Sequence, residues 1–381
     1  MTVLSALRLS RAPVAAFAAV GVTWGCFAAM APVLKARAGV DDATFGLMLL
    51  GTALGLATTL YVAPRWDRGL GRWAMPLGTV LVAFAALGPG WAATPLALFL
   101  ALTLMGATSG LTDVVMNARV SEIEARAARS LMNANHAMFS VAYAASALAT
   151  GAMREAGWTP EQIFPAISAA LLLLAPFQFM ETARPEPPDP DAPTRLPVAL
   201  IAVCSGIVLI AFMAESTVES WSALHIERTL NGGAAEGAFG PAMLGITMAL
   251  GRFSGQVVAA RFSEVGVIRI ASALAVAGVL VAASAPSPGV AYLGFGLLGL
   301  GISVIGPMGL ALAGRLATPR QRTAVIARVA VIGFLGFFLA PALMGLGSEA
   351  FGLRWAFAGV AVLLAVVWPL SRSAHAAPIR P

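Results

Sequence analysis

Long apolar stretches separated by short polar segments run through the whole chain. A helix needs about 20 predominantly apolar residues to cross a hydrocarbon core about 30 Å thick. Charge-poor stretches of suitable length recur along the sequence, so we predict an all-α membrane protein with twelve transmembrane helices. The predicted spans are 14–33, 43–64, 73–94, 95–118, 130–153, 162–180, 196–221, 237–260, 268–286, 288–314, 329–348 and 355–371.

One polar segment stands out in the middle of the chain. Between Glu181 and Arg195, five prolines alternate with acidic residues, a composition typical of an extended linker. The segment separates six predicted spans from six others. We therefore predict an N-terminal six-helix bundle at 1–180, a proline-rich linker at 181–195 and a C-terminal six-helix bundle at 196–381. The other loops are too short to hold a folded domain.

The two predicted bundles share an internal repeat at an offset of 196 residues. The sequence Ala53-Leu54-Gly55 recurs as Ala249-Leu250-Gly251 in the second half. The repeat maps the second span onto the eighth and the fourth onto the tenth in parallel orientation, an architecture used by secondary transporters. Further matching pairs are Val62/Val258, Ala63/Ala259, Arg65/Arg261, Leu104/Leu300, Gly110/Gly306 and Arg119/Arg315.

Composition excludes a soluble globular protein. The chain is 59% hydrophobic and only 11% charged, whereas ordinary soluble domains carry about 25% charged residues. Its formal net charge of +6 is spread thinly over the loops between spans, so it reflects membrane topology and does not predict a nucleic-acid partner. The N-terminus resembles a secretory signal, but we expect it to be retained as the first span.

Several kinds of chemistry have no sequence support. Lys35 is the only lysine and lies in a loop, so the chain has no Walker A motif for ATP. The three histidines are far apart, which argues against a metal-dependent protease, and the GxSxG motif of serine hydrolases does not occur. Cys26 and Cys204 both lie in apolar runs and predict neither a disulfide nor a metal pair. We therefore expect no enzyme activity and no cofactor.

Basic residues predict the orientation, since arginine and lysine are enriched in cytoplasmic loops. Eighteen arginines fall on the side of the termini and the central linker. The other side carries only five basic residues, and Arg252 lies inside a span. We therefore predict a bacterial inner-membrane protein with both termini and the linker in the cytoplasm. The five are Lys35, Arg37, Arg154, Arg228 and Arg354.

The segment Arg65-Trp66-Asp67-Arg68-Gly69-Leu70-Gly71-Arg72 follows the second predicted span. Further candidate residues are Asp113, Asn117 and Arg119 in span four, Asn133, His136 and Ser140 in span five, and Glu215, Glu219, Trp221 and Ser222 in span seven. The segment is similar to the signature that the major facilitator superfamily has between spans two and three, with one extra residue before the last Gly-Arg. The residues of spans four, five and seven resemble those of the fucose permease-like branch of bacterial inner-membrane permeases within this superfamily.

This resemblance implies roles for individual residues. In sugar permeases of the branch an acidic residue in span four carries the coupling proton, which matches Asp113, and a polar residue in span five faces the cavity, which matches His136. The branch also has an acidic residue in span one, where this chain has none. A gating role is implied for the signature residues and the end of span four, namely Asp67, Arg68, Arg72 and Arg119.

The ionisable residues inside spans are functional candidates on physical grounds too, since a charge at the bilayer centre costs at least about 2.5–3.5 kcal/mol. Asp113 and Asn117 are four residues apart and share one helix face. We predict proton coupling by Asp113, His136 and Glu215. We predict substrate binding by Asn117, His136, Ser140, Glu215 and Arg252.

Structural roles are the alternatives for these residues. Asp113 could form a static hydrogen bond between helices, and His136 could be a neutral residue held between helices. Glu219 is expected as a solvated acid at a helix end. The tryptophans Trp91, Trp158 and Trp221 are expected as anchors at the membrane interface.

Arg252 has three possible roles. It could neutralise an anionic substrate, extend toward the headgroups, or pair with Asp113 across the two bundles. Its counterpart in the repeat is Leu56, so the repeat itself does not require a charge there. We hypothesise that Asp113 and Arg252 approach when the cytoplasmic side closes and separate when it opens.

The combined prediction is a secondary active transporter that moves a small polar solute across the inner membrane by proton-coupled alternating access. Its predicted partners are the solute, protons and the lipid bilayer, and we expect a monomer. A proton-antiport exporter of a drug or metabolite is an alternative, as is a non-transporting membrane sensor or scaffold. A sensor would be expected to carry added soluble domains or long tails.

Overall fold

The computed structural model describes residues 3–181, 196–318 and 320–376, and within these ranges it is helical without strands. The first half of the chain contains the helices α1 (Val3–Leu9), α2 (Arg11–Ala38), α3 (Asp42–Met48), α4 (Leu50–Leu70), η1 (Gly71–Trp73), α5 (Ala74–Trp91), α6 (Pro95–Ala127), α7 (Met132–Glu155), α8 (Pro160–Leu174) and η2 (Ala175–Gln178).

The second half contains α9 (Val198–Leu224), η3 (His225–Thr229), α10 (Ala234–Arg261), α11 (Glu264–Ser284), α12 (Pro288–Leu316), α13 (Arg322–Phe351) and α14 (Leu353–Ala376). Each of the twelve stretches predicted as spans therefore overlaps helical residues, and most of the helices are longer than predicted. The exceptions include 43–64, which is divided between α3 and α4, and 73–94, which extends past the end of α5 at Trp91. The linker prediction at 181–195 lies almost wholly outside the described residues, and the division into two bundles remains a prediction.

The tightest predicted connections are confirmed. Helix α5 ends at Trp91 and α6 begins at Pro95, where Thr94 accepts a hydrogen bond from the amide of Ala97 at 3.2 Å. A threonine before the helix followed by proline in its first turn is a favourable start, because the proline removes an amide that would lack a partner. Between α11 and α12, Pro288 opens the next helix in the same way.

Ten helical segments are long and apolar enough to cross a membrane, judged over the described residues. The 24-residue helix α7 and the 28-residue helix α10 are not among them. The chain is thus a multi-pass membrane protein by composition, and the count of twelve spans remains a prediction.

Two expectations about the seventh span are wrong. Helix α9 continues past the predicted end at 221 and runs into the π-helical turn η3, so Glu219 lies inside a helix and is half-buried. Trp221 is fully buried against Phe45 of α3, with ring centroids 5.8 Å apart, and so does not anchor the interface. Trp91 and Trp158, by contrast, are exposed as expected.

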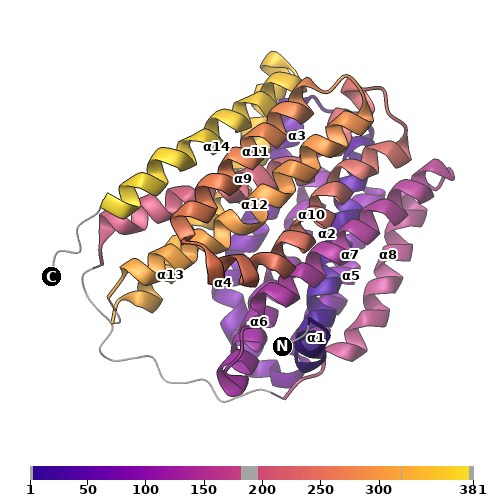
Figure 1. Cartoon of the computed structure of the whole chain (residues 1–381). Coiled ribbons are helices and arrows are strands. Elements are labelled where there is room, and N and C mark those ends of the chain that lie inside the picture. The colour runs from indigo at the N-terminus through magenta and orange to yellow at the C-terminus, as the bar shows by residue number, and fades with distance from the viewer. Residues whose placement is uncertain (1–2, 182–195, 319, 377–381) are drawn as a thin grey trace.

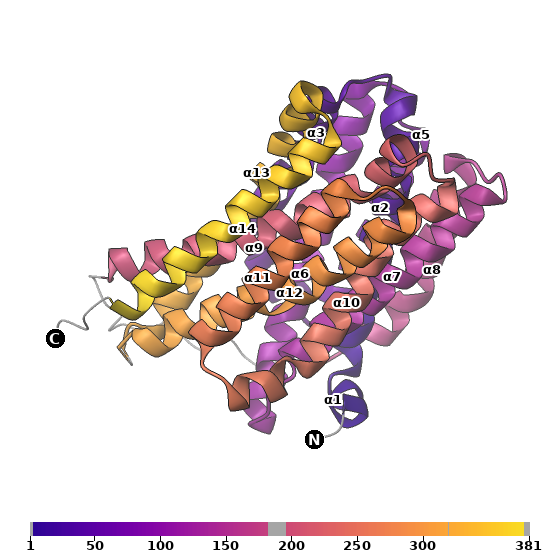
Figure 2. The same ribbon diagram turned by 45° about the horizontal axis from the view of Figure 1, so that its top comes forward.

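Both termini lie at the same end of the molecule, which we call the terminal end (Figure 1). We call the opposite end the far end. The helices of the two halves of the chain converge at the far end and diverge toward the terminal end (Figures 1 and 2). Across the halves, α7 packs on α10, α3 on α13 and α2 on α9.

Glycines allow these helices to approach closely. A Cβ atom on Gly46 of α3 would lie 2.5 Å from the carbonyl oxygen of Pro341, and one on Gly345 of α13 would lie 2.4 Å from that of Asp42. Within the first half, Cβ atoms on Gly55 and Gly106 would lie 2.0 and 2.2 Å from carbonyl oxygens of Thr103 and Thr52 respectively. The glycines spaced four residues apart, Gly51 with Gly55 in α4 and Gly106 with Gly110 in α6, are therefore packing positions.

We expect Gly55→Ala to lower the thermal stability of the purified protein in detergent. The new methyl group would overlap the α6 backbone, and overpacking of this kind costs about 1–3 kcal/mol. Gly359→Ala is the matched control, because a Cβ at that position in α14 meets no atom within 4 Å. Equal melting temperatures for the two variants would contradict this account of the α4–α6 contact.

Candidate functional site

A buried ion pair joins the helices at the centre of the molecule. Arg252 of α10 lies 3.1 Å from Glu215 of α9, measured from Nη2 to Oε1, and the exposed fractions of their side chains are 13% and 8%. From the other half of the chain, Ser140 Oγ of α7 accepts a hydrogen bond from Arg252 Nη1 at 2.5 Å, and the His136 carbonyl accepts a second at 3.3 Å. Arg252 thus links α9 and α10 to α7.

Aromatic and acidic side chains surround this pair. The His136 ring packs edge-on against Phe17 of α2, with centroids 4.8 Å apart. Tyr143 of α7 is buried and lies within electrostatic range of Glu215 and Glu219, and its hydroxyl has no hydrogen-bond partner among the described residues. We call Arg252, Glu215, Glu219, Ser140, His136 and Tyr143 the central cluster.

Most residues of this cluster were predicted from the sequence, but their pairing was not. Tyr143 was missed, although it is one of only three tyrosines in the chain and follows Ser140 by one helical turn. Among the three roles considered for Arg252, the structure shows neither the contact with Asp113 nor an extended side chain at the headgroups.

Asp113 lies apart from the central cluster in this structure. It is half-buried on α6, and the Asn117 side chain donates to its backbone carbonyl at 2.9 Å. No ion pair joins the Asp113 carboxylate to His136 or Arg252 within the described ranges. The hypothesised approach to Arg252 belongs to a conformation closed at the terminal end, so it remains a prediction.

A second charged cluster lies near the terminal end and is confined to the first half of the chain. Arg119 is almost fully buried and pairs with Asp67 and with Glu122, the latter at 2.5 Å. The predicted gating residues Asp67 and Arg119 therefore meet. Arg68 instead donates to the Pro64 carbonyl at 3.1 Å on the surface. Arg72 is also exposed and lies 3.8 Å from Glu181, so these two arginines do not join the buried pair.

The far end carries ion pairs between the two halves that were not predicted from the sequence. Asp42 of α3 is 3% exposed and pairs with Lys35 at 3.0 Å and with Arg228 of the second half at 2.5 Å. Ser348 of α13 also donates to Asp42, and Glu349 accepts from the Asp42 amide at 3.0 Å. Asp42 is therefore held by groups from three separate parts of the chain.

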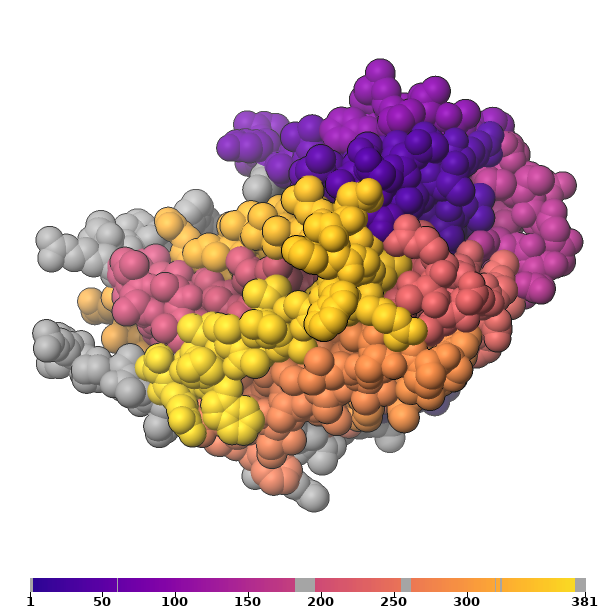
Figure 3. Space-filling view, turned by 90° about the horizontal axis from the view of Figure 1, so that it is seen from above, coloured from indigo at the N-terminus to yellow at the C-terminus, as the bar shows by residue number. Residues whose placement is uncertain are grey.

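A second pair reinforces this end. Arg154 of α7 makes a two-pronged contact with Glu227 of η3 at 2.6 and 2.9 Å and donates to the Ala29 carbonyl at 2.6 Å. Figure 3 views the molecule from above and shows the last helices of the chain, in yellow, in contact with the first ones, in indigo. We call Asp42–Arg228 and Arg154–Glu227 the far-end pairs.

A signal for these contacts was present in the sequence. The five basic residues on the side where basic residues are scarce are all bonded. Lys35, Arg154 and Arg228 form the contacts above, Arg37 pairs with Glu161 at 2.5 Å, and Arg354 donates to the carbonyls of Ala283 and Ala285. A basic residue at an end where such residues are rare can thus indicate a specific acidic or carbonyl partner.

Comparison with known proteins identifies the family. The Major Facilitator Superfamily profile matches residues 14–288 and 204–378, which together span almost the whole sequence. The chain belongs to the major facilitator superfamily. Members of this superfamily are transporters, so the chain is a multi-pass membrane transporter and not an enzyme. The narrower resemblance to fucose permeases remains a prediction.

Relatives in bacteria match along nearly their full length. The chain is 28% identical to an uncharacterized MFS-type transporter of Yersinia pestis, with 94% of each chain aligned. It is 29% identical to the transporter y4wD of Sinorhizobium fredii, over 94% of this chain and 96% of that one. Membrane protein MosC of Rhizobium meliloti is 25% identical, over 87% of this chain and 82% of MosC.

Solved structures show the same fold. A bacterial homolog of the human lysosomal transporter Spinster, in an inward-facing and occupied conformation, matches with a TM-score of 0.79 at 16% identity, over 98% of this chain and 97% of that one. A mutant form of the nucleoside transporter NupG matches with a TM-score of 0.74 at 13% identity, over 97% of this chain and 99% of that one. At these identities the match supports the fold alone.

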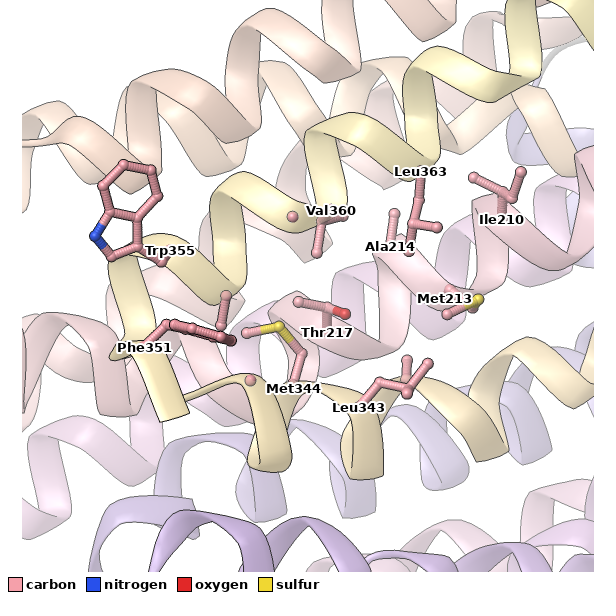
Figure 4. A pocket seen from close by; sticks show the side chains of 14 residues that line it. Ile210, Met213, Ala214, Thr217, Leu343, Met344, Phe351, Trp355, Val360 and Leu363 are labelled. Atoms are coloured by element: carbon pink, nitrogen blue, oxygen red, sulfur yellow. The ribbon is translucent and has the colours of Figure 1, made fainter. Parts of the chain in front are cut away.

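An apolar groove lies apart from the central cluster of this transporter. It has a volume of about 270 Å³ and is formed by α9, α13 and α14, with Met213, Met344 and Trp355 among its lining side chains (Figure 4). None of the residues of the central cluster lines it. The groove therefore does not combine with the polar residues into one site.

We expect Asp42→Asn to open the far end more often. The change removes the charge shared by Lys35 and Arg228, and it leaves Lys35, whose side chain is only 14% exposed, without its acid, which is destabilising. The reporter is a cysteine replacing Ala238, a fully buried residue of α10 that packs with Ala29 of α2 and Ala147 of α7. The variant chain also carries Cys26→Ser and Cys204→Ser. The maleimide labelling rate of the reporter is expected to rise on the order of tenfold, which corresponds to about 1.4 kcal/mol.

Asp41→Asn is the matched control. The Thr44 amide donates to Asp41 at 2.7 Å and holds the pKa of this exposed carboxyl below its usual value, so the control also removes a full negative charge at neutral pH. Labelling that rises equally in both variants would show that the loss of any negative charge, and not the loss of the Asp42 contacts, opens the far end.

Proposed function

We propose that this superfamily member is a proton-coupled secondary transporter that moves a small polar solute across the bacterial inner membrane by alternating access. The observation that carries the proposal is the contact of Arg252 with both Glu215 and α7. It places a buried charge pair where the two halves of the chain meet. A charge within a span is costly, so a charge that is present there is a candidate for binding or coupling.

The contacts between the halves suggest how such a transporter could alternate. The far-end pairs hold residues 1–180 against residues 196–381 at one end, while Arg119 at the other end pairs only within the first half among the described residues. Opening the far end would require Asp42 to release Arg228 and Glu227 to release Arg154. We propose that the two halves move as six-helix bundles around the α7–α10 contact.

Proton exchange fits the chemistry of the central cluster. Protonation of Glu215 would remove its charge and weaken its attraction for Arg252, freeing donors that a solute's polar groups could occupy. Glu219 lies one turn beyond on the same helix and adds a second carboxyl. We propose Asp113, His136 and Glu215 as the proton-exchanging groups. The proposed solute contacts are Asn117, His136, Ser140, Glu215 and Arg252.

Orientation and assembly complete the proposal. The eighteen arginines on the side of the termini, against five basic residues opposite, favour cytoplasmic termini and a cytoplasmic linker. The terminal end would then face the cytoplasm. We propose that the chain works as a monomer within the lipid bilayer.

A flux screen tests this function. The purified chain is placed in proteoliposomes with an imposed pH gradient, and a library of small polar solutes is followed across the membrane. We expect at least one solute to move against its own gradient in proportion to the pH gradient. Movement with the proton indicates symport, and movement against it indicates antiport export. Solute flux that ignores the pH gradient would refute proton coupling.

Asp113→Asn separates coupling from binding. The amide preserves the shape of the side chain but cannot titrate. We expect exchange of solute between equal concentrations to continue and uphill transport to fall at least about tenfold, the equivalent of about 1.4 kcal/mol. Glu264→Gln is the control, since Glu264 pairs with Arg315 at 3.1 Å outside the central cluster. Uphill transport that survives in Asp113→Asn would exclude Asp113 as the proton carrier.

A further inference from the structure

A second, larger hollow lies at the terminal end of the first half of the chain. Its volume is about 510 Å³, and it is formed where α1 and the start of α2 meet the end of α6 and the residues after η2. Figure 1 shows α1 beside the end of α6 at this corner of the molecule. The central cluster is not part of it. The function proposed above therefore does not use this hollow.

Two arginines give the hollow a positive rim. Arg11 begins α2 and Arg126 lies in the last turn of α6, and both line the hollow and are exposed. In the part of the chain that the structure describes, neither side chain forms an ion pair or a hydrogen bond, whereas the basic residues of the far end are all bonded. Glu181 also lines the hollow, and Arg72 lies 3.8 Å from its carboxylate. The hollow therefore presents two guanidinium groups and a single carboxylate, that of Glu181, which lies near Arg72.

The rest of the hollow is apolar. Ile123 lies buried at its base, while Leu9 and Phe179 are 45% and 42% exposed at its edge. Free phosphate would gain no binding energy from contact with these apolar side chains. A ligand that combines an anionic group with a hydrocarbon chain would contact both the arginines and the apolar surface.

The position of the hollow identifies the source of such a ligand. Three candidate membrane spans end around it, at Arg11, Ala127 and Gln178. It therefore lies at the level where phospholipid headgroups meet the hydrocarbon core, and basic pockets between helices at this level suit anionic headgroups. We propose that the hollow binds an anionic phospholipid, with Arg11 and Arg126 at its phosphate and an acyl chain over Ile123 and Phe179.

Native mass spectrometry of the full chain in detergent tests the proposal. The protein is titrated with phosphatidylglycerol or with phosphatidylethanolamine of matched acyl chains, and the bound lipid is counted. We expect phosphatidylglycerol to be retained preferentially. Each arginine near a headgroup contributes on the order of fivefold, so the double variant Arg11→Gln with Arg126→Gln should lose about tenfold or more of this preference.

A matched control removes the same charge elsewhere. Arg328 and Arg372 are exposed on α13 and α14, and neither lines the hollow. The double variant Arg328→Gln with Arg372→Gln should keep the preference. Equal losses in the two double variants, or full retention in the Arg11 and Arg126 variant, would overturn the proposal.

Two further arms distinguish a lipid from a free anion. Inorganic phosphate at the same concentration should not displace phosphatidylglycerol, and Phe179→Ser should weaken lipid binding without changing the number of arginines. Displacement by phosphate together with an unchanged Phe179→Ser variant would show a simple anion site and overturn the lipid assignment.

Discussion

The guanidinium of Arg252 constrains the centre of this transporter, because an arginine cannot lose its charge to make burial easier. The guanidinium therefore needs hydrogen-bond or charge partners wherever it is buried. The structure compensates it with the carboxylate of Glu215, the hydroxyl of Ser140 and the carbonyl of His136. Two of these three groups lie in the other half of the chain. The requirement to satisfy one charge therefore connects the two halves.

The contacts at the two ends have different characters. At the far end, acids and bases from opposite halves are paired, and glycines such as Gly46 and Gly345 let α3 and α13 touch. Near the terminal end, the buried Arg119 pairs with acids of its own half. Buried ion pairs contribute little net stability but are costly to break singly. Such contacts suit a gate that must open and close again, as long as the acid and the base of each pair become solvated in the same step.

Apolar periodicity and loop chemistry were enough to predict the helices, because a hydrocarbon environment leaves little other choice for the backbone. The resemblance to the superfamily signature indicated gating roles for Asp67 and Arg119, but not that these two residues pair with each other. Glu215 and Arg252 were each recognised as candidates, yet their pairing depended on helix rotation and on the reach of the arginine side chain, which spacing does not encode. The burial of Trp221 and the role of Asp42 were missed for a related reason, since both depend on which helix of the other half lies opposite.

A double-mutant cycle of Glu215→Gln and Arg252→Gln tests the central claim most directly, with thermal stability and proton-coupled flux as readouts. Glu215→Gln leaves a permanent buried charge, whereas in Arg252→Gln the remaining carboxyl can take up a proton and become neutral. The account predicts that Glu215→Gln is the more damaging single change. It also predicts that the double variant recovers to the level of Arg252→Gln, with a coupling energy of about 1–3 kcal/mol. Strictly additive losses would contradict it.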